Sequence, residues 1–215
     1  YFLITGQSCY KDENEELPLP LLSSSIHFVP LYSDKDEHSI VDFNIHNSEN
    51  QPIVLKEASL SIMGTFDKNG MLSFEMIYLG HDKGVEQNSV FGKTVGIDEE
   101  NIIKGQLLLA RGVHKFSLIL RTRGAVQLKS NFKIAALKLQ FENIKSVEIP
   151  LVASYTFRPC LKVRKKGQDV CDTYRIPGLI TTKKGTLIAV YDNRYNNSFD
   201  LQEHIDIGMS RSIDG

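Results

Sequence analysis

The sequence predicts an all-β fold whose N-terminal part is an antiparallel β-sandwich of the jelly-roll kind. Apolar residues recur at every second position in several short segments between Ser23 and Thr156, which is the pattern of strands with one face turned inward. Glycine, asparagine and aspartate residues separate these segments at roughly regular spacing. No long stretch has the period of an amphipathic helix. Many short strands of this kind are typical of two-layered all-β domains.

Taken in sequence order, the predicted strands are separated by turn residues and follow an irregular start. The acidic, proline-containing stretch 11–20 predicts an irregular connector. Alternating segments then follow, divided by turn residues such as Gly64. The segment 96–109 is ambiguous, because its apolar pairs, including Ile102-Ile103, fit a short helix as well as a strand. The predicted strands cover residues 25–31, 38–46, 55–62, 72–78, 113–122 and 146–152.

The composition changes after Thr156, where a basic connector begins. We therefore expect residues 1–156 to form the sandwich and residues 157–215 to form a linker and a second part. Cys160 and Cys171 bracket a short basic loop. A disulfide between them would stabilise this loop by roughly 3 kcal/mol, and two buried thiols are the alternative. No histidine nearby completes a zinc-ligand pattern.

Size and charge exclude several classes of protein. A chain of 215 residues, of which 41% are hydrophobic, can bury one large core, or one domain plus part of another. A net charge of -1 gives no reason to expect nucleic acid or an anionic membrane as partner. No apolar run is long enough to span a bilayer. The apolar start up to Cys9 fits a docked strand better than a remnant of an export signal or lipoprotein box. The acidic stretch 34–38 fits a solvated turn better than a calcium site.

A hairpin near the C-terminal end places two arginines close together. Pro177 should push Ile176 into extended geometry, so we expect Arg175 at the start of a strand. Arg194 closes the apolar run that follows the turn residues 182–185. Antiparallel pairing brings the start of one strand beside the end of the next. Both guanidinium groups should therefore reach one site, although exposed arginines in surface ion pairs would show the same sequence.

The order of four motifs resembles the opening of an exo-α-sialidase (neuraminidase) catalytic domain, which is a six-bladed β-propeller with Asp-boxes (BNR repeats). Some bacterial sialidases carry an N-terminal β-sandwich before this propeller. The resemblance implies that residues 157–215 hold the linker and the first propeller strands. The motifs are Tyr174-Arg175-Ile176-Pro177, Asn193-Arg194, Asp200 and Ser212-Ile213-Asp214-Gly215.

The resemblance also implies roles for individual residues. Arg175 is expected to bind the carboxylate of sialic acid, since a planar guanidinium pairs bidentately with a carboxylate. Arg194 is expected to line the pocket near the 4-position of the sugar. Asp200 is expected to be the general acid/base, a role that needs a carboxyl whose pKa can be raised. The competing titratable side chains nearby are Asp192, Glu203, His204 and Asp206. The Asp-box residues Ser212 and Asp214 are structural.

Other catalytic groups of the family lie outside the matched motifs. Retaining sialidases use a tyrosine nucleophile assisted by a glutamate, together with two further arginines, all far downstream. We therefore expect the 215-residue chain alone to hydrolyse no sialoside. No metal or other cofactor is expected. Sialylated glycans are extracellular, and a disulfide would need an oxidising compartment, so a periplasmic, secreted or cell-surface location is expected.

The N-terminal sandwich has two further interpretations. As a non-catalytic glycan-binding module it would raise the effective concentration of substrate, with Tyr32, Tyr78 or Phe91 as stacking platforms. As a structural spacer it would only pack against the propeller. The absence of tryptophan weakens the glycan-binding interpretation.

Overall fold

The computed structural model describes residues 19–28, 30–82, 85–123, 126–151, 155–200 and 204–213. Over these ranges the regular structure is almost entirely β-strand, with one short 3₁₀ turn at Gln168–Val170 and no α-helix. The chain divides into two compact units, the first ending at Cys160 and the second beginning at Leu161. The predicted all-β class with antiparallel sheets is confirmed.

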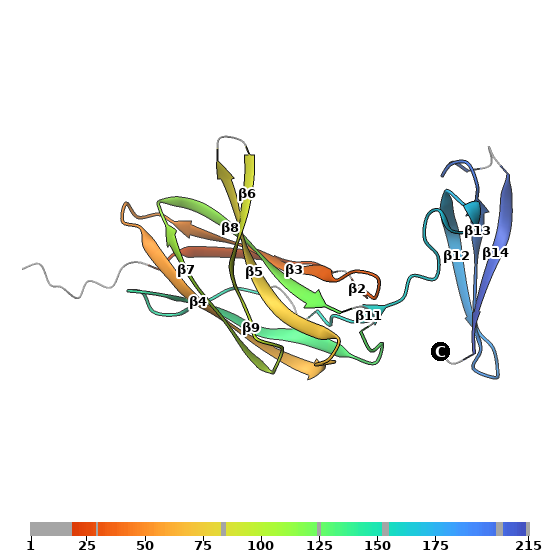
Figure 1. Cartoon of the computed structure of the whole chain (residues 1–215), viewed down its shortest axis with the longest axis horizontal. Coiled ribbons are helices and arrows are strands. Elements are labelled where there is room, and N and C mark those ends of the chain that lie inside the picture. The colour runs from red at the N-terminus through yellow and green to blue at the C-terminus, as the bar shows by residue number, and fades with distance from the viewer. Residues whose placement is uncertain are drawn as a thin grey trace, which may run out of the picture. The chain divides into compact units, whose positions relative to one another are not determined.

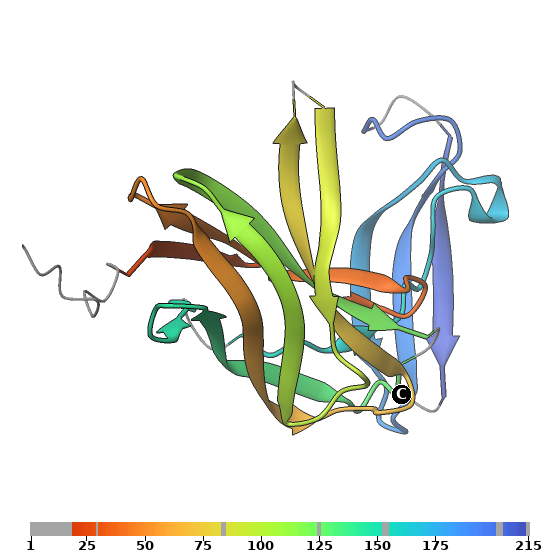
Figure 2. The same ribbon diagram turned by 60° about the vertical axis from the view of Figure 1, so that its left-hand side comes forward.

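The first unit contains two antiparallel sheets stacked in two layers (Figure 1 and Figure 2). The five-stranded sheet has the order β1-β3-β8-β5-β6. Its strands are Leu21–Ile26 (β1), Glu37–Asn47 (β3), Gly112–Thr122 (β8), Met71–Asp82 (β5) and Val85–Lys93 (β6). The four-stranded sheet has the order β10-β9-β4-β7. Its strands are Val147–Glu148 (β10), Asn131–Phe141 (β9), Ile53–Thr65 (β4) and Glu100–Leu109 (β7).

The hydrophobic core lies between these two sheets. Phe74 of β5 meets Phe132 of β9 edge to face, with 6.1 Å between the ring centroids, so the layers interdigitate. Within the five-stranded sheet Phe43 stacks on Phe116 at 5.2 Å. Burying a phenylalanine of this kind contributes about 1.5–3 kcal/mol. The alternating apolar residues that predicted the strands are the ones that supply this core.

Two predicted features of the sandwich are resolved by the structure. The ambiguous segment contains strand β7, in which Ile103 and Leu109 are buried while Ile102 and Leu108 are exposed. Burial that alternates with period two is incompatible with a helix. Within the predicted strand 146–152, the structure has strand β10 at Val147–Glu148.

Strand β9 was not predicted because a β-bulge interrupts its pattern. Ser61 pairs with Ala136, and the next residue of β4, Ile62, pairs with Ile134. Ala135 is therefore an extra residue, and buried side chains change phase across it, from Phe132 and Ile134 to Leu137 and Leu139. Strand β6 was also missed, since the exposed residues at this sheet edge do not alternate.

The first unit extends a few residues past the predicted boundary after Thr156. Phe157 is buried and forms an isolated bridge with Phe132, and its ring stacks on that of Phe132 at 5.0 Å. Pro159–Cys160 (β11) pairs in parallel with Leu31–Tyr32 (β2). Apolar packing and backbone pairing thus keep these residues with the sandwich. Cys160 and Cys171 are thiols and form no disulfide.

The second unit is one antiparallel sheet of three strands in chain order. Its strands are Thr173–Thr181 (β12), Leu187–Arg194 (β13) and Ile205–Ser212 (β14). The predicted hairpin is therefore present. Its turn is closed by hydrogen bonds from the Thr182 amide to the Thr186 carbonyl and from the Gly185 amide to the Thr182 carbonyl, both 2.9 Å. Gly185 has φ +83°, a conformation that favours glycine. Ser212 ends β14, and the rest of the Asp-box, Asp214-Gly215, lies outside the described residues.

Candidate functional site

The backbone around Arg175 differs from the prediction. Strand β12 begins at Thr173, so Arg175 is its third residue rather than its first. Ile176 has φ +52°, so the expectation that Pro177 holds it extended is wrong. The reason is a β-bulge: Arg175 pairs with Asp192, whereas Gly178 pairs with Val190. An extra residue on β12 is absorbed by the left-handed turn of the backbone at Ile176.

Pairing in the hairpin brings the two predicted arginines onto one face. Arg175 is opposite Asp192, and Thr173 is opposite Arg194. Asp192 and Arg194 are two residues apart on β13 and so point to the same side of the sheet. Arg175 shares that side with its partner Asp192.

The structure brings all three predicted site residues together. The Nη1 atom of Arg175 lies 3.0 Å from Oδ1 of Asp200, and the Nη1 atom of Arg194 lies 2.7 Å from the same oxygen. One carboxylate oxygen therefore forms ion pairs with both guanidinium groups. This contact confirms the geometric part of the expectation, while the catalytic roles of the three residues stay predictions.

The two arginines also hold the loop that carries Asp200. Arg175 donates to the Ser198 carbonyl at 2.8 Å. Arg194 donates from Nη1 to the carbonyls of Ser198 at 3.1 Å and Phe199 at 2.7 Å. The side chain of Asn197 accepts a hydrogen bond from the Phe199 amide at 2.8 Å, which closes a local turn. The loop is thus fixed to the end of the hairpin by charge-assisted hydrogen bonds.

The two arginines differ in access to solvent. The side chain of Arg194 is 3% exposed, whereas that of Arg175 is 38% exposed. Arg194 also donates from Nη2 to Asp192 at 2.9 Å, and its Nε is buried without a partner among the described residues. Hydrogen bonds to Asp192 and Asp200 raise the pKa of Arg194, so it stays charged. Arg175 is the arginine that a ligand can reach.

The electrostatics of Asp200 are those of an ionised carboxylate. The hydrogen bond from Arg194 and the charge of Arg175 lower the pKa of Asp200 below its usual value. Its side chain is 64% exposed, so burial offsets this effect only slightly. A general acid needs the opposite shift. In this structure the Asp200 carboxylate is an anion held between the cationic side chains of Arg175 and Arg194.

The opposite face of the sheet carries two tyrosines with structural roles. Tyr174 donates from its hydroxyl to the Gln168 carbonyl at 2.7 Å, and its pKa is raised to about 12, chiefly by burial. Its ring meets that of Tyr191 edge to face at 5.4 Å. The Tyr191 hydroxyl accepts from Arg164 at 2.6 Å and lies 2.7 Å from the Ser210 hydroxyl. A tyrosine nucleophile is better served by a lowered pKa, so Tyr174 does not suit that role.

Comparison with known proteins adds an independent observation. No protein-family model matches this chain. A curated protein of Bacteroides fragilis (strain YCH46) named "Sialidase" is 38% identical over 115 residues, which cover 53% of this chain and 21% of that protein. The chain is related to a bacterial sialidase. The solved structure of the Hadza microbial sialidase Hz136 matches 89% of this chain and 42% of its own with a TM-score of 0.65. At 22% identity that match shows a shared fold.

The sialidase-related chain spans about a fifth of the length of the curated relative. The resemblance to sialidases predicted from the motifs of the second unit is thus confirmed by a comparison that does not depend on them alone.

The competing titratable residues of the sialidase-related chain have other partners. Asp192 is bound to Arg194, and Asp206 accepts from the Tyr195 hydroxyl at 2.9 Å. His204 lies 3.4 Å from Asp206, and Glu203 lies outside the described residues. Sequence reasoning missed the carbonyls of the Asp200 loop, since a backbone acceptor is independent of residue type.

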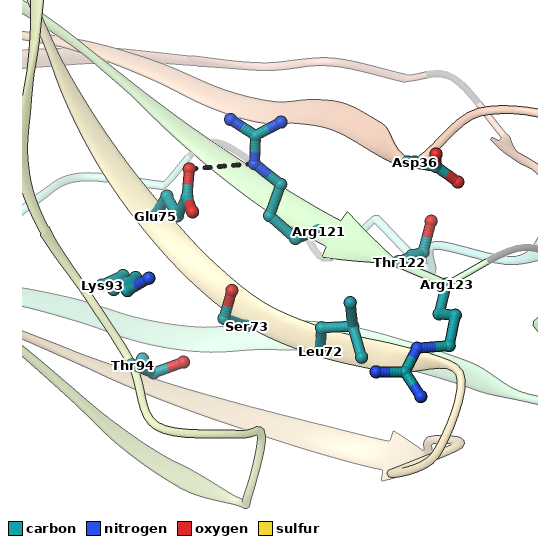
Figure 3. Close-up of a pocket in the computed structure, with 9 residues that line it drawn as sticks. All are labelled: Asp36, Leu72, Ser73, Glu75, Lys93, Thr94, Arg121, Thr122 and Arg123. Carbon is teal, nitrogen blue, oxygen red and sulfur yellow. Dashed lines mark hydrogen bonds and ion pairs between the residues drawn. The ribbon is translucent and has the colours of Figure 1, made fainter.

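The sandwich of the sialidase-related chain also carries a shallow pocket of about 690 Å³ (Figure 3). Ser73 and Arg121 are cross-strand partners that flank it, and Arg121 is held by Glu75 at 2.9 Å and by Glu37. Lys93 lies on the other side of Ser73 from Arg123 (Figure 3). The lining residues are Asp36, Leu72, Ser73, Glu75, Lys93, Thr94, Arg121, Thr122 and Arg123.

The predicted stacking platforms do not line this pocket. Tyr78 and Phe91 are partly buried against the core, and Tyr78 is bound to His114 at 3.2 Å. Tyr32 belongs to the short strand β2. The pocket is instead lined by charged and hydroxyl side chains.

Proposed function

We propose that this chain is the N-terminal portion of a retaining exo-α-sialidase, a glycoside hydrolase that removes terminal sialic acids from glycoconjugates. The observation that carries the proposal is the convergence of Arg175 and Arg194 on one carboxylate oxygen of Asp200. The 38% identity to a bacterial sialidase supports the same activity. The sialylated glycans are extracellular, so we propose a periplasmic, secreted or cell-surface location.

In this proposal Arg175 binds the carboxylate of sialic acid. Its side chain is 38% exposed, and within the described residues only its Nη1 atom makes hydrogen bonds. The other guanidinium nitrogens are therefore available for a bidentate contact. The carboxylate of Asp200 lies 3.0 Å from Arg175, so the space beside this guanidinium group is large enough for a carboxylate.

Substrate binding would also prepare Asp200 for acid catalysis. A substrate carboxylate competes for Arg175 and adds a negative charge beside Asp200. Both changes raise the pKa of Asp200, because a nearby cation is neutralised and a like charge is added. Asp200 then protonates the leaving glycosidic oxygen and later activates water. Arg194 remains in place and lines the pocket near the 4-position of the sugar.

The remaining catalytic groups of the proposed enzyme belong to the rest of the propeller. The family resemblance assigns it a tyrosine nucleophile, a glutamate and two further arginines. The three-stranded sheet has exposed apolar side chains suited to packing against further strands, namely Ile180, Ile207 and Met209. We propose that this sheet is the start of the first blade.

A second candidate function is glycan binding by the sandwich. It is favoured by the pocket in the first unit, where the side chains of Lys93 and Arg123 have no hydrogen bond or ion pair with any described residue. Charged and hydroxyl groups on an open surface suit a polar sugar. Such a site would hold the enzyme near its substrate, whereas a sandwich without it would be a spacer.

Titration of the 215-residue chain with N-acetylneuraminic acid, followed by NMR, tests the main proposal. The side-chain signal of Arg175 is expected to shift on binding. Arg175→Gln should abolish the response, whereas Arg211→Gln, at an exposed arginine of the same sheet, should preserve it. An unchanged response in Arg175→Gln, or none in the unsubstituted chain, would contradict the assigned role.

Two assays complete the test. Hydrolysis of a fluorogenic sialoside is expected to be undetectable with the 215-residue chain, and measurable turnover would refute the assignment of the nucleophile to the rest of the propeller. A glycan array separates the two interpretations of the sandwich. Binding that is lost in Arg123→Gln supports the pocket, and a flat array supports the spacer.

A further inference from the structure

Asp192 and Asp200 contact Arg194 through different nitrogens. The Nη2 atom of Arg194 donates to Oδ2 of Asp192 at 2.9 Å, while its Nη1 atom lies 2.7 Å from Oδ1 of Asp200. Nη1 also donates to the carbonyls of Ser198 and Phe199, and Nε has no partner among the described residues. A guanidinium group is a rigid planar fork, so a contact that fixes one terminal nitrogen also fixes the direction of the other. The contact with Asp192 therefore helps to set the direction of Nη1.

Asp192 is the more firmly held of the two acids. It lies on β13 two residues before Arg194 and on the same face of the sheet. Strand β13 pairs with β12 on one side and with β14 on the other, so the backbone of Asp192 is held from both sides. The side chain of Asp192 is 26% exposed and that of Asp200 is 64% exposed. Solvent therefore screens the attraction between Asp192 and Arg194 less strongly.

The contact with Asp192 excludes a tighter pairing of Arg194 with Asp200. Arginine often binds a carboxylate through two parallel hydrogen bonds, either end-on from Nη1 and Nη2 or side-on from Nε and Nη2. Both arrangements use Nη2, which here is committed to Asp192. A bidentate pair would further stabilise the ionised form of Asp200, whereas a general acid must be able to take up a proton.

We infer that Asp192 is a positioning residue, which occupies Nη2 of Arg194 and so leaves Asp200 with a single nitrogen of that arginine. This inference rests on the proposed function, in which Asp200 is the general acid/base. Asp192 acts through Arg194, because it withholds the second nitrogen from Asp200. When a substrate carboxylate competes for Arg175, protonation of Asp200 then has to overcome one contact with Arg194 instead of two.

Two substitutions of Asp192 separate its hydrogen bond from its charge. The pKa of Asp200 is measured by NMR of its carboxyl carbon in the unsubstituted chain, in Asp192→Asn and in Asp192→Ala. Both substitutions remove a negative charge near Asp200 and should lower its pKa. Asparagine keeps an oxygen that accepts from Nη2, whereas alanine leaves Nη2 free to turn to Asp200. The fall should therefore be larger in Asp192→Ala. Equal falls in the two variants, or a rise in Asp192→Ala, would overturn the inference.

A measurement that leaves Asp192 in place decides the matter if Asp192→Ala disrupts the sheet, which the amide signals of β13 and β14 would reveal. In Asp200→Asn the Nη2 protons of Arg194 should keep their protection against solvent exchange, because Asp192 still holds them. Loss of this protection would show that Asp200 positions Arg194 and would refute the role of Asp192. No measurement uses a sialoside, so a confirmed role of Asp192 without sialic acid binding would refute only the proposed function.

Discussion

Arg194, buried at the end of β13, forms a 2.7 Å ion pair with the exposed carboxylate of Asp200. This pair links the rigid part of the second unit to the loop 195–200. The loop is also anchored by hydrogen bonds from Arg194 and Arg175 to its carbonyls. A side chain with little access to solvent therefore contributes to the order of the site.

Replacement of Arg194 should loosen the second unit. Arg194→Met removes the partner of Asp192 and the donors to the loop carbonyls, at a cost of about 2 kcal/mol for hydrogen bonds involving a charged group. Amide hydrogen exchange of β13 measures this loss locally, which suits a chain of two units. Arg211→Met, at an exposed site, should change protection by less than about 0.5 kcal/mol. Equal protection in the two variants would contradict the anchoring role.

The stabilising effect of Asp200 should depend on pH in a defined direction. Its folded-state pKa is lowered by Arg194 and Arg175, so its contribution is present above the unfolded pKa of about 3.9 and is lost as pH falls through the folded value. Asp200→Asn should therefore lower the Tm of the second unit at pH 7. Thermal unfolding followed by tyrosine circular dichroism should show this difference vanish in strong acid. A difference that is independent of pH would exclude the ion pairs as its cause.

His38 gives the sandwich a pH dependence in a different range. Its side chain is buried, and burial is the main cause that lowers its pKa. The neutral form is favoured in the folded state, so stability is complete above about pH 6.5 and decreases as pH falls below it. His38→Gln should flatten the dependence of Tm on pH between about 6.5 and 5. An unchanged slope in His38→Gln would contradict the role of His38.

Phe132 should be among the most sensitive residues of the core. Its ring stacks on Phe157 at 5.0 Å and meets Phe74 edge to face, so one side chain joins β9 to the opposite sheet and to the end of the first unit. Phe132→Ala should cost about 3–5 kcal/mol. Phe28→Ala, at a side chain that is 64% exposed, should cost less than half as much. Urea unfolding of both variants measures the difference, and similar costs would contradict the central position of Phe132.

The sequence predicted the parts of the fold that follow a regular period. Alternating apolar residues in β3 and β4 identified the strands, and the turn residues between Thr181 and Leu187 identified the hairpin. Pairing at the two ends of that hairpin was enough to predict that Arg175 and Arg194 share a site. These features depend on side-chain type and spacing, both of which the sequence displays.

The features that the sequence did not predict arise from tertiary context. Ala135 interrupts the period of β9 because a bulge there fits the register of β4. Ile176 adopts a positive φ that its own preferences oppose, because pairing on both sides fixes the backbone. The lowered pKa of Asp200 depends on two guanidinium groups from neighbouring strands. In each case distant parts of the chain override a local preference.

The edge strand β14 of the three-stranded sheet affects how the chain behaves at high concentration. Among the described residues β14 pairs on one side only, with β13, and it displays Ile207 and Met209 to water. A strand with open backbone donors and apolar side chains is a template on which a second copy can add in register. Concentrated samples of the 215-residue chain should therefore self-associate through this edge. A lysine at position 207 should keep them monodisperse.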